Sequence, residues 1–563
     1  MVGTAVAAGR IAVAADPVGS GGRLCALTED GRPAGPADAV RDLAAVVTRR
    51  EAADAPRWVW AATDVTYPWL LDRGAARLAR CHDVKLVESL LLGQEGRHRR
   101  PRSLGAAWAR LDGRPEPEDA PEPGADDQPV LFAADRHHLP QDVDPLDALI
   151  AVHAAQQRRI ADGERPDRTR LLCAAESAGA LAAVEMGRDG LPWSADIHDE
   201  LLIGLLGPRP AGGARPALLN DLALRIQDAL GRPVNPDSPA QMLPAFARLG
   251  VHLTSTRSHE LRKVEHPAAA LFLRYRELSR IHAAHGWAWR ESWVRDGRFR
   301  PEYVVGGVVS GRWATRGGGA LQIPRLLRGA VVADPGHRLV VADAGQLEPR
   351  VLAAMSGDLG LAKAAGAGDL YAALARDAFS GDRPRAKIGL LAAMYGQTSG
   401  EAGQLLAVMR RRFPEALALV ESAARTGEAG GIVRSQLGRT SPAPSARFLD
   451  ESADPGDGAS PDRRAARSWG RFTRNFVIQA SASDWALAML AALRRRLTAV
   501  GPEPRLVFFQ HDEVIVHTPE RLAPAVEAAV TAAGDEARRL VFGATPVRFP
   551  LETHVVECYV DAK

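Results

Sequence analysis

Two short apolar runs in the C-terminal half of the chain carry acidic residues at their tips, and this pattern constrains the fold most. Asp343 directly follows the run 339–342. Asp512 and Glu513 interrupt the apolar stretch 506–516, which predicts a hairpin with the acids at its turn. An acid inside such a run is costly to bury unless a cation meets it. A lone Asp of this kind is more often a turn residue, but carboxylates from two strands are what a two-metal phosphoryl-transfer site requires.

Residues 381–400, which lie between these acids in the sequence, predict a helix. Asp382 can cap its start, and Gly396 and Gly400 mark its expected end. Four residues at a spacing of four form one stripe about 18 Å long on such a helix: Arg383, Lys387, Leu391 and Tyr395. The two cations at the N-terminal end of this stripe could hold a triphosphate, and the aromatic ring at its C-terminal end could contact a base pair. The alternative is an ordinary solvated basic face.

In order and spacing, these three segments resemble motifs A, B and C of family A DNA polymerases, the bacterial polymerase I type. Residues 343–350 resemble motif A and residues 510–513 resemble motif C. Motif B is matched by Arg383, Lys387, Tyr395 and Gly396. Residues 310–312 and 321–324, and the set Arg471, Asn475, Gln479 and Asp484, resemble further primer- and template-binding elements of the family. The resemblance runs from about residue 215 to residue 555.

The resemblance implies a function and a ligand for each matched residue. Asp343, Asp512 and the carbonyl of Ala344 would hold two Mg²⁺ ions, with Mn²⁺ as a possible substitute, and Glu513 would be an auxiliary acid. Lys387 would protonate the leaving pyrophosphate. The dNTP-binding set would be Arg383, Lys387, Leu391, Tyr395, Glu348, Gln346 and His511. The residues binding primer-template DNA would be Arg312, Gln322, Arg471, Asn475 and Gln479.

Several positions depart from the family pattern close to these residues, including Gly345 for Ser and Ala392 for Gly. Ala344 stands where the family has Tyr, and Leu391 stands where it has the Phe that packs on the incoming sugar. Glu348 resembles the residue that excludes a ribose 2′-hydroxyl. No metal ligand is lost, so we expect activity, with sugar selectivity and nucleotide affinity changed.

The implied fold class is mixed α/β (α+β): a right-hand polymerase with a thumb, a palm built on an antiparallel sheet and helical fingers, after a ribonuclease H-like exonuclease-type domain. We expect the exonuclease-like domain at 1–212, the thumb at 213–300, the palm at 301–355 and 470–563, and the fingers at 356–469. Two Pro- and Asp-rich stretches, about 112–129 and about 441–462, predict disordered or surface-loop insertions.

The exonuclease-like region lacks most of the four carboxylates of the family's proofreading site. Asp16 is followed two residues later by Val18 where Glu is expected. Pro68 replaces the second Asp, and Val143 stands where a Tyr precedes Asp147. One or two remaining acids cannot neutralise two divalent ions, so we expect the nuclease activity to be lost. The alternative is that acids from elsewhere complete the site. The flap-nuclease domain of polymerase I is not expected.

Composition sets broader limits. The net charge of +3 is too small to argue for nucleic-acid binding by the whole surface, so DNA contacts would rest on local Arg clusters. Four scattered Cys and an apolar start interrupted by charges predict reduced thiols and no signal peptide. We expect a monomer in the cytoplasm, associated with the nucleoid, with no membrane-spanning stretch. Two other functions remain: a DNA-binding scaffold derived from a polymerase, and a single-subunit RNA polymerase.

Overall fold

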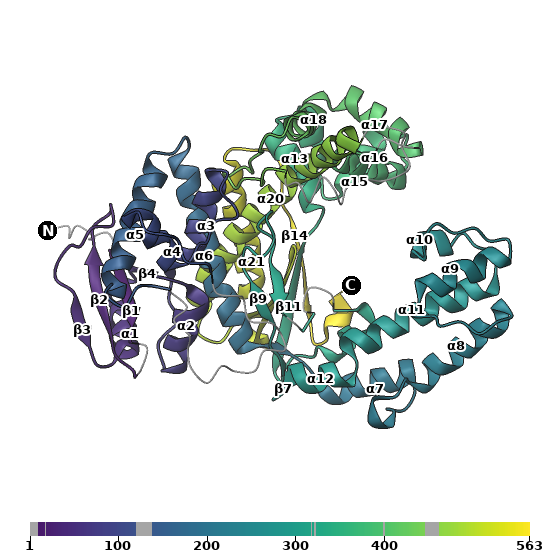
Figure 1. The fold of residues 1–563 in the computed structure, drawn as a ribbon, viewed down its shortest axis with the longest axis horizontal. Helices are drawn as coiled ribbons and strands as arrows, with labels where there is room; N and C mark the ends of the chain where they lie inside the picture. Colours follow the sequence, from purple (N-terminus) through teal and green to yellow (C-terminus); the bar gives the residue numbers. More distant parts are fainter. Residues whose placement is uncertain are drawn as a thin grey trace.

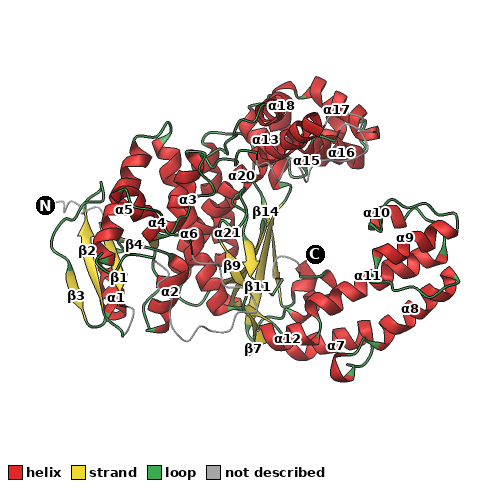
Figure 2. Ribbon diagram, viewed as in Figure 1, coloured by secondary structure: helices red, strands yellow, loops and turns green. Residues whose placement is uncertain are grey.

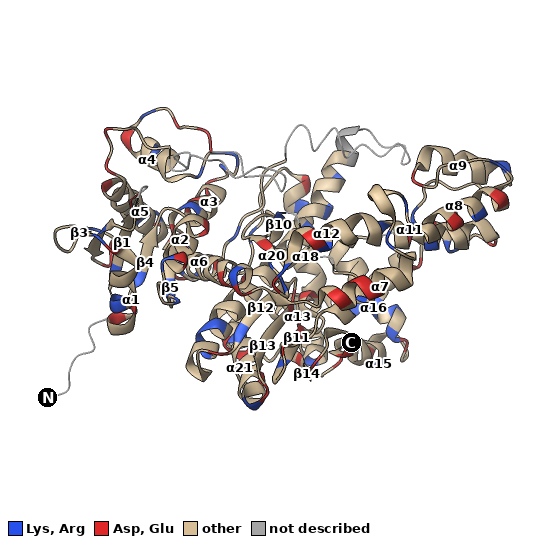
Figure 3. Ribbon diagram, turned by 90° about the horizontal axis from the view of Figure 1, so that it is seen from below, with Lys and Arg blue, Asp and Glu red and all other residues tan. Residues whose placement is uncertain are grey.

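The structure is a computed structural model, and it describes residues 9–16, 19–119, 138–316, 318–319, 323–397, 400–444 and 461–562. Within these ranges it is a mixed α/β protein (Figure 1). The N-terminal part lies on one side, a central layer holds the long helix and a four-stranded sheet, and two groups of helices project away from the N-terminal part (Figure 2). Acidic and basic residues are interspersed throughout (Figure 3).

A five-stranded mixed sheet in the order β3-β2-β1-β4-β5 forms the centre of the N-terminal part. Strand β1 pairs antiparallel with β2 and parallel with β4, which pairs parallel with β5. The strands are β1 (Arg10–Ala15), β2 (Gly22–Leu27), β3 (Asp38–Val40), β4 (Arg57–Trp60) and β5 (Arg80–Asp83). The helices are α1 (Leu43–Asp54), α2 (Thr63–Asp72), α3 (Val84–Gln94), α4 (Leu104–Asp112), α5 (Pro145–Ala161) and α6 (Pro166–Asp189).

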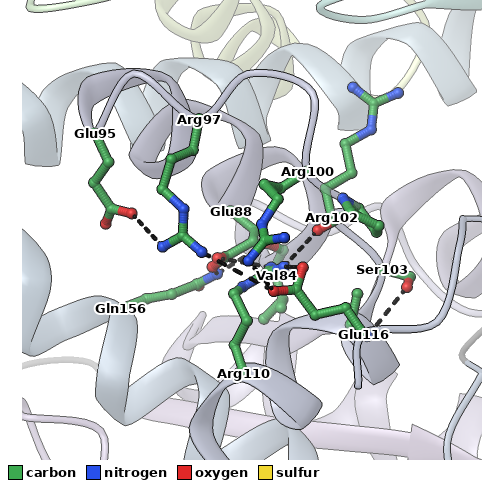
Figure 4. Close-up of polar contacts among 12 residues, drawn as sticks. Val84, Glu88, Glu95, Arg97, Arg100, Arg102, Ser103, Arg110, Glu116 and Gln156 are labelled. Carbon is green, nitrogen blue, oxygen red and sulfur yellow. Dashed lines mark hydrogen bonds and ion pairs between the residues drawn. The ribbon is translucent and has the colours of Figure 1, made fainter. Parts of the chain in front are cut away.

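The first residues of the stretch predicted as an insertion at 112–129 form an ordered loop tied to the domain. Glu116 pairs with Arg110 at 2.5 Å and with Arg100 at 3.0 Å. Asp119 accepts the backbone N–H of Ser103 at 2.8 Å. Glu116 faces an arginine cluster around the buried Glu88 (Figure 4). The surface-loop alternative therefore holds for residues 112–119, while 120–129 lie outside the described residues, as does most of the second stretch, 441–462.

The next helices form an elongated arm with a core of its own. Its buried residues include Phe246, Phe272 and Tyr275. The elements of this region are β6 (Leu191–Pro192), α7 (Ala195–Leu206), η1 (Ala211–Gly213), α8 (Ala217–Leu230), α9 (Pro239–Arg248), α10 (Ser258–Leu261), α11 (Pro267–His285), α12 (Trp287–Trp293), β7 (Val294–Arg295), β8 (Arg298–Phe299), β9 (Glu302–Val304) and β10 (Ala314–Arg316).

The central sheet has the order β12-β13-β11-β14, and all of its neighbouring strands are antiparallel. Helix α20 spans 40 residues, about 60 Å, and packs beside α6, α18 and α21. The elements of this layer are η3 (Arg325–Ala330), β11 (His337–Ala344), α20 (Pro461–Val500), β12 (Arg505–Gln510), β13 (Glu513–Pro519), η4 (Glu520–Leu522), α21 (Ala523–Phe542), β14 (Leu551–Val556) and η5 (Tyr559–Ala562).

The expectation that no apolar stretch is long enough to span a membrane was wrong: one helix in the described residues qualifies by its length and composition. Residues 465–500 of α20 pass that test, but 89% of the apolar window is buried inside the protein. The helix is apolar because neighbouring helices and the sheet cover it on several sides.

The remaining helices form the second projecting group. They are α13 (Leu347–Ser356), α14 (Leu359–Gly366), α15 (Leu370–Ala378), α16 (Arg383–Tyr395), α17 (Gly400–Arg412) and α18 (Pro414–Glu428). Helix α16 begins and ends where the sequence predicts, with the Asp382 side chain accepting the Arg385 N–H and with Gly396 at φ 72°. Gly400 begins α17 instead of ending α16.

Arg350 joins this helical group to the central sheet. Its guanidinium is buried and donates to the carbonyls of Gly345 at 2.9 Å, Ala365 at 2.6 Å, Gly368 at 2.6 Å and Arg548 at 3.0 Å. These bonds fix the loop after β11 against the start of α15 and the approach to β14. A sequence pattern gives no sign of this role, because the acceptors are all backbone carbonyls.

Replacing Arg350 with Met should therefore lower stability strongly. Met fills a similar volume but leaves buried carbonyls without donors, and we expect a loss of about 2–4 kcal/mol. Calorimetric unfolding would show a lower midpoint. Arg548 is exposed, so Arg548→Met is the matched control and should change stability by less than about 0.5 kcal/mol. Equal midpoints for the two variants would contradict this role of Arg350.

Candidate active site

The two acids predicted to share a site lie at the same end of neighbouring strands. Strands β11 and β13 are antiparallel, with Asp343 opposite Glu513, and Asp343 is opposite Glu552 of β14 on its other side. The Ala344 N–H donates to the carbonyl of Asp512 at 3.0 Å. The structure thus brings Asp343 and Asp512 together from positions 169 residues apart in the sequence.

Two residues beside these acids have left-handed backbone conformations. His511 in the β12–β13 turn has φ 58°, and Gln346 at the start of α13 has φ 60°. Left-handed backbone costs a residue with a Cβ about 1–2 kcal/mol, and such positions are concentrated at functional sites. In this way the turns place the acids at the strand ends, with Asp343 and Asp512 half-buried.

The donor atoms at this sheet end are hard oxygens, which suit Mg²⁺. They are the Asp343 and Asp512 carboxylates, with the backbone carbonyl of Ala344 beside them. No three His, Cys, Asp or Glu side chains in the described ranges form a ready-made metal cage. The residues fit a Mg²⁺ ion that takes one or two carboxylates from the protein and completes its coordination with substrate phosphates and water.

Glu513 has a structural partner that the sequence did not indicate. It is buried, and the hydroxyl of Tyr559 in η5 donates to its Oε1. Burial raises the pKa of Tyr559, and the Glu513 carboxylate raises it further. Tyr559 therefore holds the Glu513 side chain in a fixed position next to Asp343 and Asp512. The auxiliary role of Glu513 in catalysis stays a prediction.

Glu348 links two residues that the sequence analysis had assigned to different ligands. It lies in the first turn of α13, pairs with Arg312 and accepts the Tyr395 hydroxyl at 2.7 Å on Oε2. Burial raises the pKa of Tyr395 to about 12, with the hydrogen bond to Glu348 as the next cause. Motif A, motif B and the 310–312 turn therefore meet at one carboxylate.

Arg383 and Gln346 converge on Asp369, a residue that the sequence analysis missed. Arg383 Nε donates to Asp369 at 2.7 Å, and Gln346 Nε2 donates to it at 2.9 Å. Asp369 also caps α15 through the Ala372 N–H. Burial alone would raise the pKa of Asp369, but the hydrogen bonds from Arg383, Gln346 and the capped N–H lower it to about 2.

Lys387 lies one turn along α16 from Arg383 and is exposed. It forms no hydrogen bond or ion pair with any residue in the described part of the chain. Leu391 and Tyr395 continue the stripe and are half-buried. The stripe thus keeps one cation held by Asp369 and one cation available to a ligand.

The residues predicted to bind primer-template DNA, and His511 of the dNTP-binding set, lie around this arrangement. Arg312 and His511 line one small cavity of about 20 Å³, and burial, followed by the nearby Arg312, lowers the pKa of His511. Arg471, Asn475 and Gln479 lie at helical spacing on α20. Gln322 lies outside the described residues.

Arg474, which the sequence analysis gave no role, holds α20 against α16. It donates from Nε to the Ala393 carbonyl at 2.6 Å. The backbone at Gly396 lies close to both Arg471 and Arg474, since a Cβ there would be 3.4 Å from each side chain. Motif B and the α20 element therefore form one packed unit.

Unlike the acid pair at the end of β11 and β13, the acids of the exonuclease-like domain lie on elements that are not neighbouring strands of one sheet. Asp16 at the end of β1 and Asp147 in the first turn of α5 are both exposed. Asp83 is buried and caps α3, accepting the Leu86 N–H at 2.8 Å and the Thr63 N–H at 2.7 Å. Burial raises the pKa of Asp83 to about 6. Asp83 is therefore used as a structural cap.

The comparisons with known proteins identify the family to which this fold belongs. The family model for DNA polymerase family A matches residues 216–555. This chain belongs to DNA polymerase family A. That result confirms the resemblance stated from the three motifs.

Two curated relatives and one solved structure give the extent of the likeness. The DNA polymerase I of Chloroflexus aurantiacus is 30% identical over 345 residues, which are 53% of this chain and 35% of the relative. The thermostable DNA polymerase I of Thermus aquaticus is 25% identical over 421 residues, 66% of this chain and 48% of the relative. The chain thus spans between a third and a half of the length of these relatives.

The solved structure is described as the POL domain of Pol1 from M. smegmatis in complex with DNA primer-template and dNTP. It superposes with a TM-score of 0.71 at 20% identity and covers 98% of this chain and 95% of that chain. At this identity the likeness shows the fold, and it confirms the predicted fold class, the right-hand polymerase with a preceding α/β domain.

Proposed function

We propose that this protein is a template-directed DNA polymerase that adds dNTPs to the 3′-hydroxyl of a primer annealed to DNA. One observation carries the proposal: Asp343 and Asp512 lie side by side at the end of β11 and β13, joined by the hydrogen bond from Ala344 to Asp512. Family membership and the fold support it. The paired acids and the stripe on α16 match the two needs of phosphoryl transfer, charge stabilisation and positioning.

The proposed mechanism assigns each step to residues at this site. Two Mg²⁺ ions, when bound, would supply Lewis-acid stabilisation of charge at the reacting phosphate, and Mn²⁺ would serve in their place. Asp343 and Asp512 would hold them with the Ala344 carbonyl. Lys387 would contact the triphosphate and give a proton to the leaving pyrophosphate, and Arg383 would contact the phosphates beside Asp369.

The remaining predicted residues would position the two substrates. Glu348, held by Arg312 and Tyr395, would close the space that a ribose 2′-hydroxyl needs. His511 would lie near the primer terminus with Arg312 beside it. Arg471, Asn475 and Gln479 on α20 would contact the template and the minor groove, whose acceptors are shared by all correct pairs.

We further propose that the N-terminal domain has no 3′–5′ exonuclease activity. Asp16 and Asp147 are exposed on separate elements, and Asp83 serves as a helix cap. We take the arm α8–α11 as the thumb, α14–α18 as the fingers, and the central sheet with α20 and α21 as the palm. The boundary proposed at 469/470 falls inside α20 (Pro461–Val500), so the palm would begin with that helix.

Primer extension tests the function directly. Purified protein, Mg²⁺ and a labelled primer on two templates of different sequence should give extension that follows each template with dNTPs and much less with rNTPs. Extension with rNTPs alone would favour the single-subunit RNA polymerase. Binding of the template without nucleotide incorporation would favour the alternative of a non-catalytic DNA-binding scaffold. A labelled single strand in the same reaction should keep its 3′ end.

Shortening Glu348 should weaken the choice between the two sugars. Glu348→Ala opens the volume beside Tyr395, and we expect the preference for dNTPs over rNTPs to fall by about 10- to 100-fold in ratios of kcat/KM. Glu348→Gln keeps the volume and is the matched control, so it should retain most of the preference. An Ala variant that still excludes rNTPs as well as the unmutated protein does would contradict the role of Glu348.

A further inference from the structure

The loop after α18 is held between the N-terminal domain and α20. Its Arg439 is buried, with Nη2 2.6 Å from Glu176 of α6 and Nε 3.5 Å from Asp484 of α20. The backbone N–H of Leu437 also donates to Asp484 at 3.1 Å. One guanidinium therefore joins a helix of the N-terminal domain to the long helix of the polymerase region.

The same ion triad supports the turn that carries Arg312. Strands β9 and β10 are antiparallel, and the turn between them is closed by the Gly311 N–H donating to Val308 at 2.8 Å. Gly311 has φ 83°, and a Cβ there would lie 2.5 Å from Arg439 Cζ. A Cβ at Gly306 would lie 2.8 Å from Glu176 Oε1. Both ends of the turn thus rest directly on Glu176 and Arg439.

The side chains of the triad are almost fully removed from solvent, with exposures of 2% for Glu176, 6% for Arg439 and 0% for Asp484. In such surroundings, loss of one partner leaves a buried charge without compensation, which is strongly destabilising. The guanidinium can therefore keep its place under Gly311 only while Glu176 and Asp484 hold it.

Other contacts of the loop come from the same domain. Gln94 donates to the Gly438 carbonyl at 3.3 Å, and Arg168 donates to the Gln436 carbonyl at 2.9 Å. His98 Nε2 lies 3.0 Å from the Thr440 carbonyl oxygen. The N-terminal domain thus contacts the loop on both sides of Arg439.

We propose that Glu176 is a positioning residue for the primer-binding turn, acting through Arg439 on Gly311 and so on Arg312. The inference rests on the proposed polymerase function. It gives the exonuclease-like domain a role in polymerisation that does not depend on nuclease carboxylates: α6 supplies part of the support on which the primer end is held.

The same two helices provide a matched control. Glu185 of α6 pairs with Arg494 of α20 at 2.5 Å, and both side chains are about as buried as Glu176 and Arg439. Its further partners are the Tyr67 hydroxyl, at 2.5 Å, and Arg77, at 3.6 Å. This second pair therefore joins the two parts away from the turn at residues 305–313.

The test compares Glu176→Gln with Glu185→Gln by hydrogen exchange of the full protein without DNA. Both variants should unfold at lower temperature, because both lose a buried ion pair. Only Glu176→Gln should speed exchange in residues 305–313. Arg439→Lys, which keeps the charge but loses the planar fork, should give the same local effect if Glu176→Gln does not fold. Equal exchange of this turn in all variants would overturn the proposal.

Kinetics give the second readout, through a double-mutant cycle. Glu176→Gln should lower kcat/KM for primer-template by about tenfold or more, because small misplacements at a reacting centre are costly. In an Arg312→Ala background the same change should cost little more, whereas the effect of Glu185→Gln should add. Full additivity of Glu176→Gln with Arg312→Ala would contradict the proposal.

If the unmutated protein extends no primer, the proposed function fails. The hydrogen-exchange experiment would still decide whether Glu176 positions the turn.

Discussion

Replacing Asp512 with Asn is expected to abolish primer extension almost completely, with a fall in kcat of at least about 10³-fold. Asn has nearly the same shape as Asp, but its neutral amide cannot offset the charge of a divalent cation. The backbone of Asp512 accepts the Ala344 N–H, and that bond does not depend on the side chain. The variant should therefore keep its strand pairing and fold, and lose the chemistry alone.

The control for this experiment is an acid remote from the site. Asp535 is exposed on α21, so Asp535→Asn removes one negative charge with no effect on the sheet end. It should extend primers at the rate of the unmutated protein. Asp343→Asn should match Asp512→Asn. An Asp512→Asn enzyme that retains a tenth or more of the activity would show that the acid pair is not the reacting centre.

The second large effect is expected at Lys387. Lys387→Ala should lower kcat/KM for dNTPs by about 10²-fold, the size typical of one lost charged contact in a transition state. Arg383 lies one turn away from Lys387 on α16, and its guanidinium is bound to Asp369. It is therefore not expected to replace the contact of Lys387 with the phosphates. Lys387→Arg keeps the positive charge but gives up its proton far less readily. That variant should recover KM better than kcat.

An exposed lysine elsewhere on the helical group serves as the control. Lys363 lies on α14 and is exposed, so Lys363→Ala should leave both kinetic constants within about twofold, as expected for a surface change away from the site. Steady-state kinetics with a single dNTP on a primed template would measure all three variants. Equal constants for Lys387→Ala and the unmutated protein would remove Lys387 from the mechanism.

The parts of the site that could be predicted from sequence are those set by local periodicity or by family motifs. The bounds of α16 follow from the Asp382 cap, the four-residue stripe and Gly396, all within 15 residues. The meeting of Asp343 and Asp512 followed from two strand-like runs with acids at their tips, together with the motif order. The left-handed backbone at His511 and Gln346 then places these acids, although neither residue is a glycine.

The residues that the sequence analysis missed act through contacts between distant segments. Asp369 becomes visible only when α15 is folded beside Arg383, and Tyr559 only when the C-terminal segment reaches Glu513. Arg350 binds carbonyls, which any residue type supplies. The same reason applies to Arg439, whose partners Glu176 and Asp484 lie 263 and 45 residues away in the sequence.

The central claim is that Asp343 and Asp512 together hold a pair of divalent cations. The most direct measurement is a crystal structure of the protein with a dideoxy-terminated primer-template, a matching dNTP and Mn²⁺, with anomalous scattering used to locate the metal. We expect two anomalous peaks roughly 3.5–4 Å apart, each within coordination distance of these two carboxylates. A bound dNTP with no anomalous peak between Asp343 and Asp512 would contradict the claim.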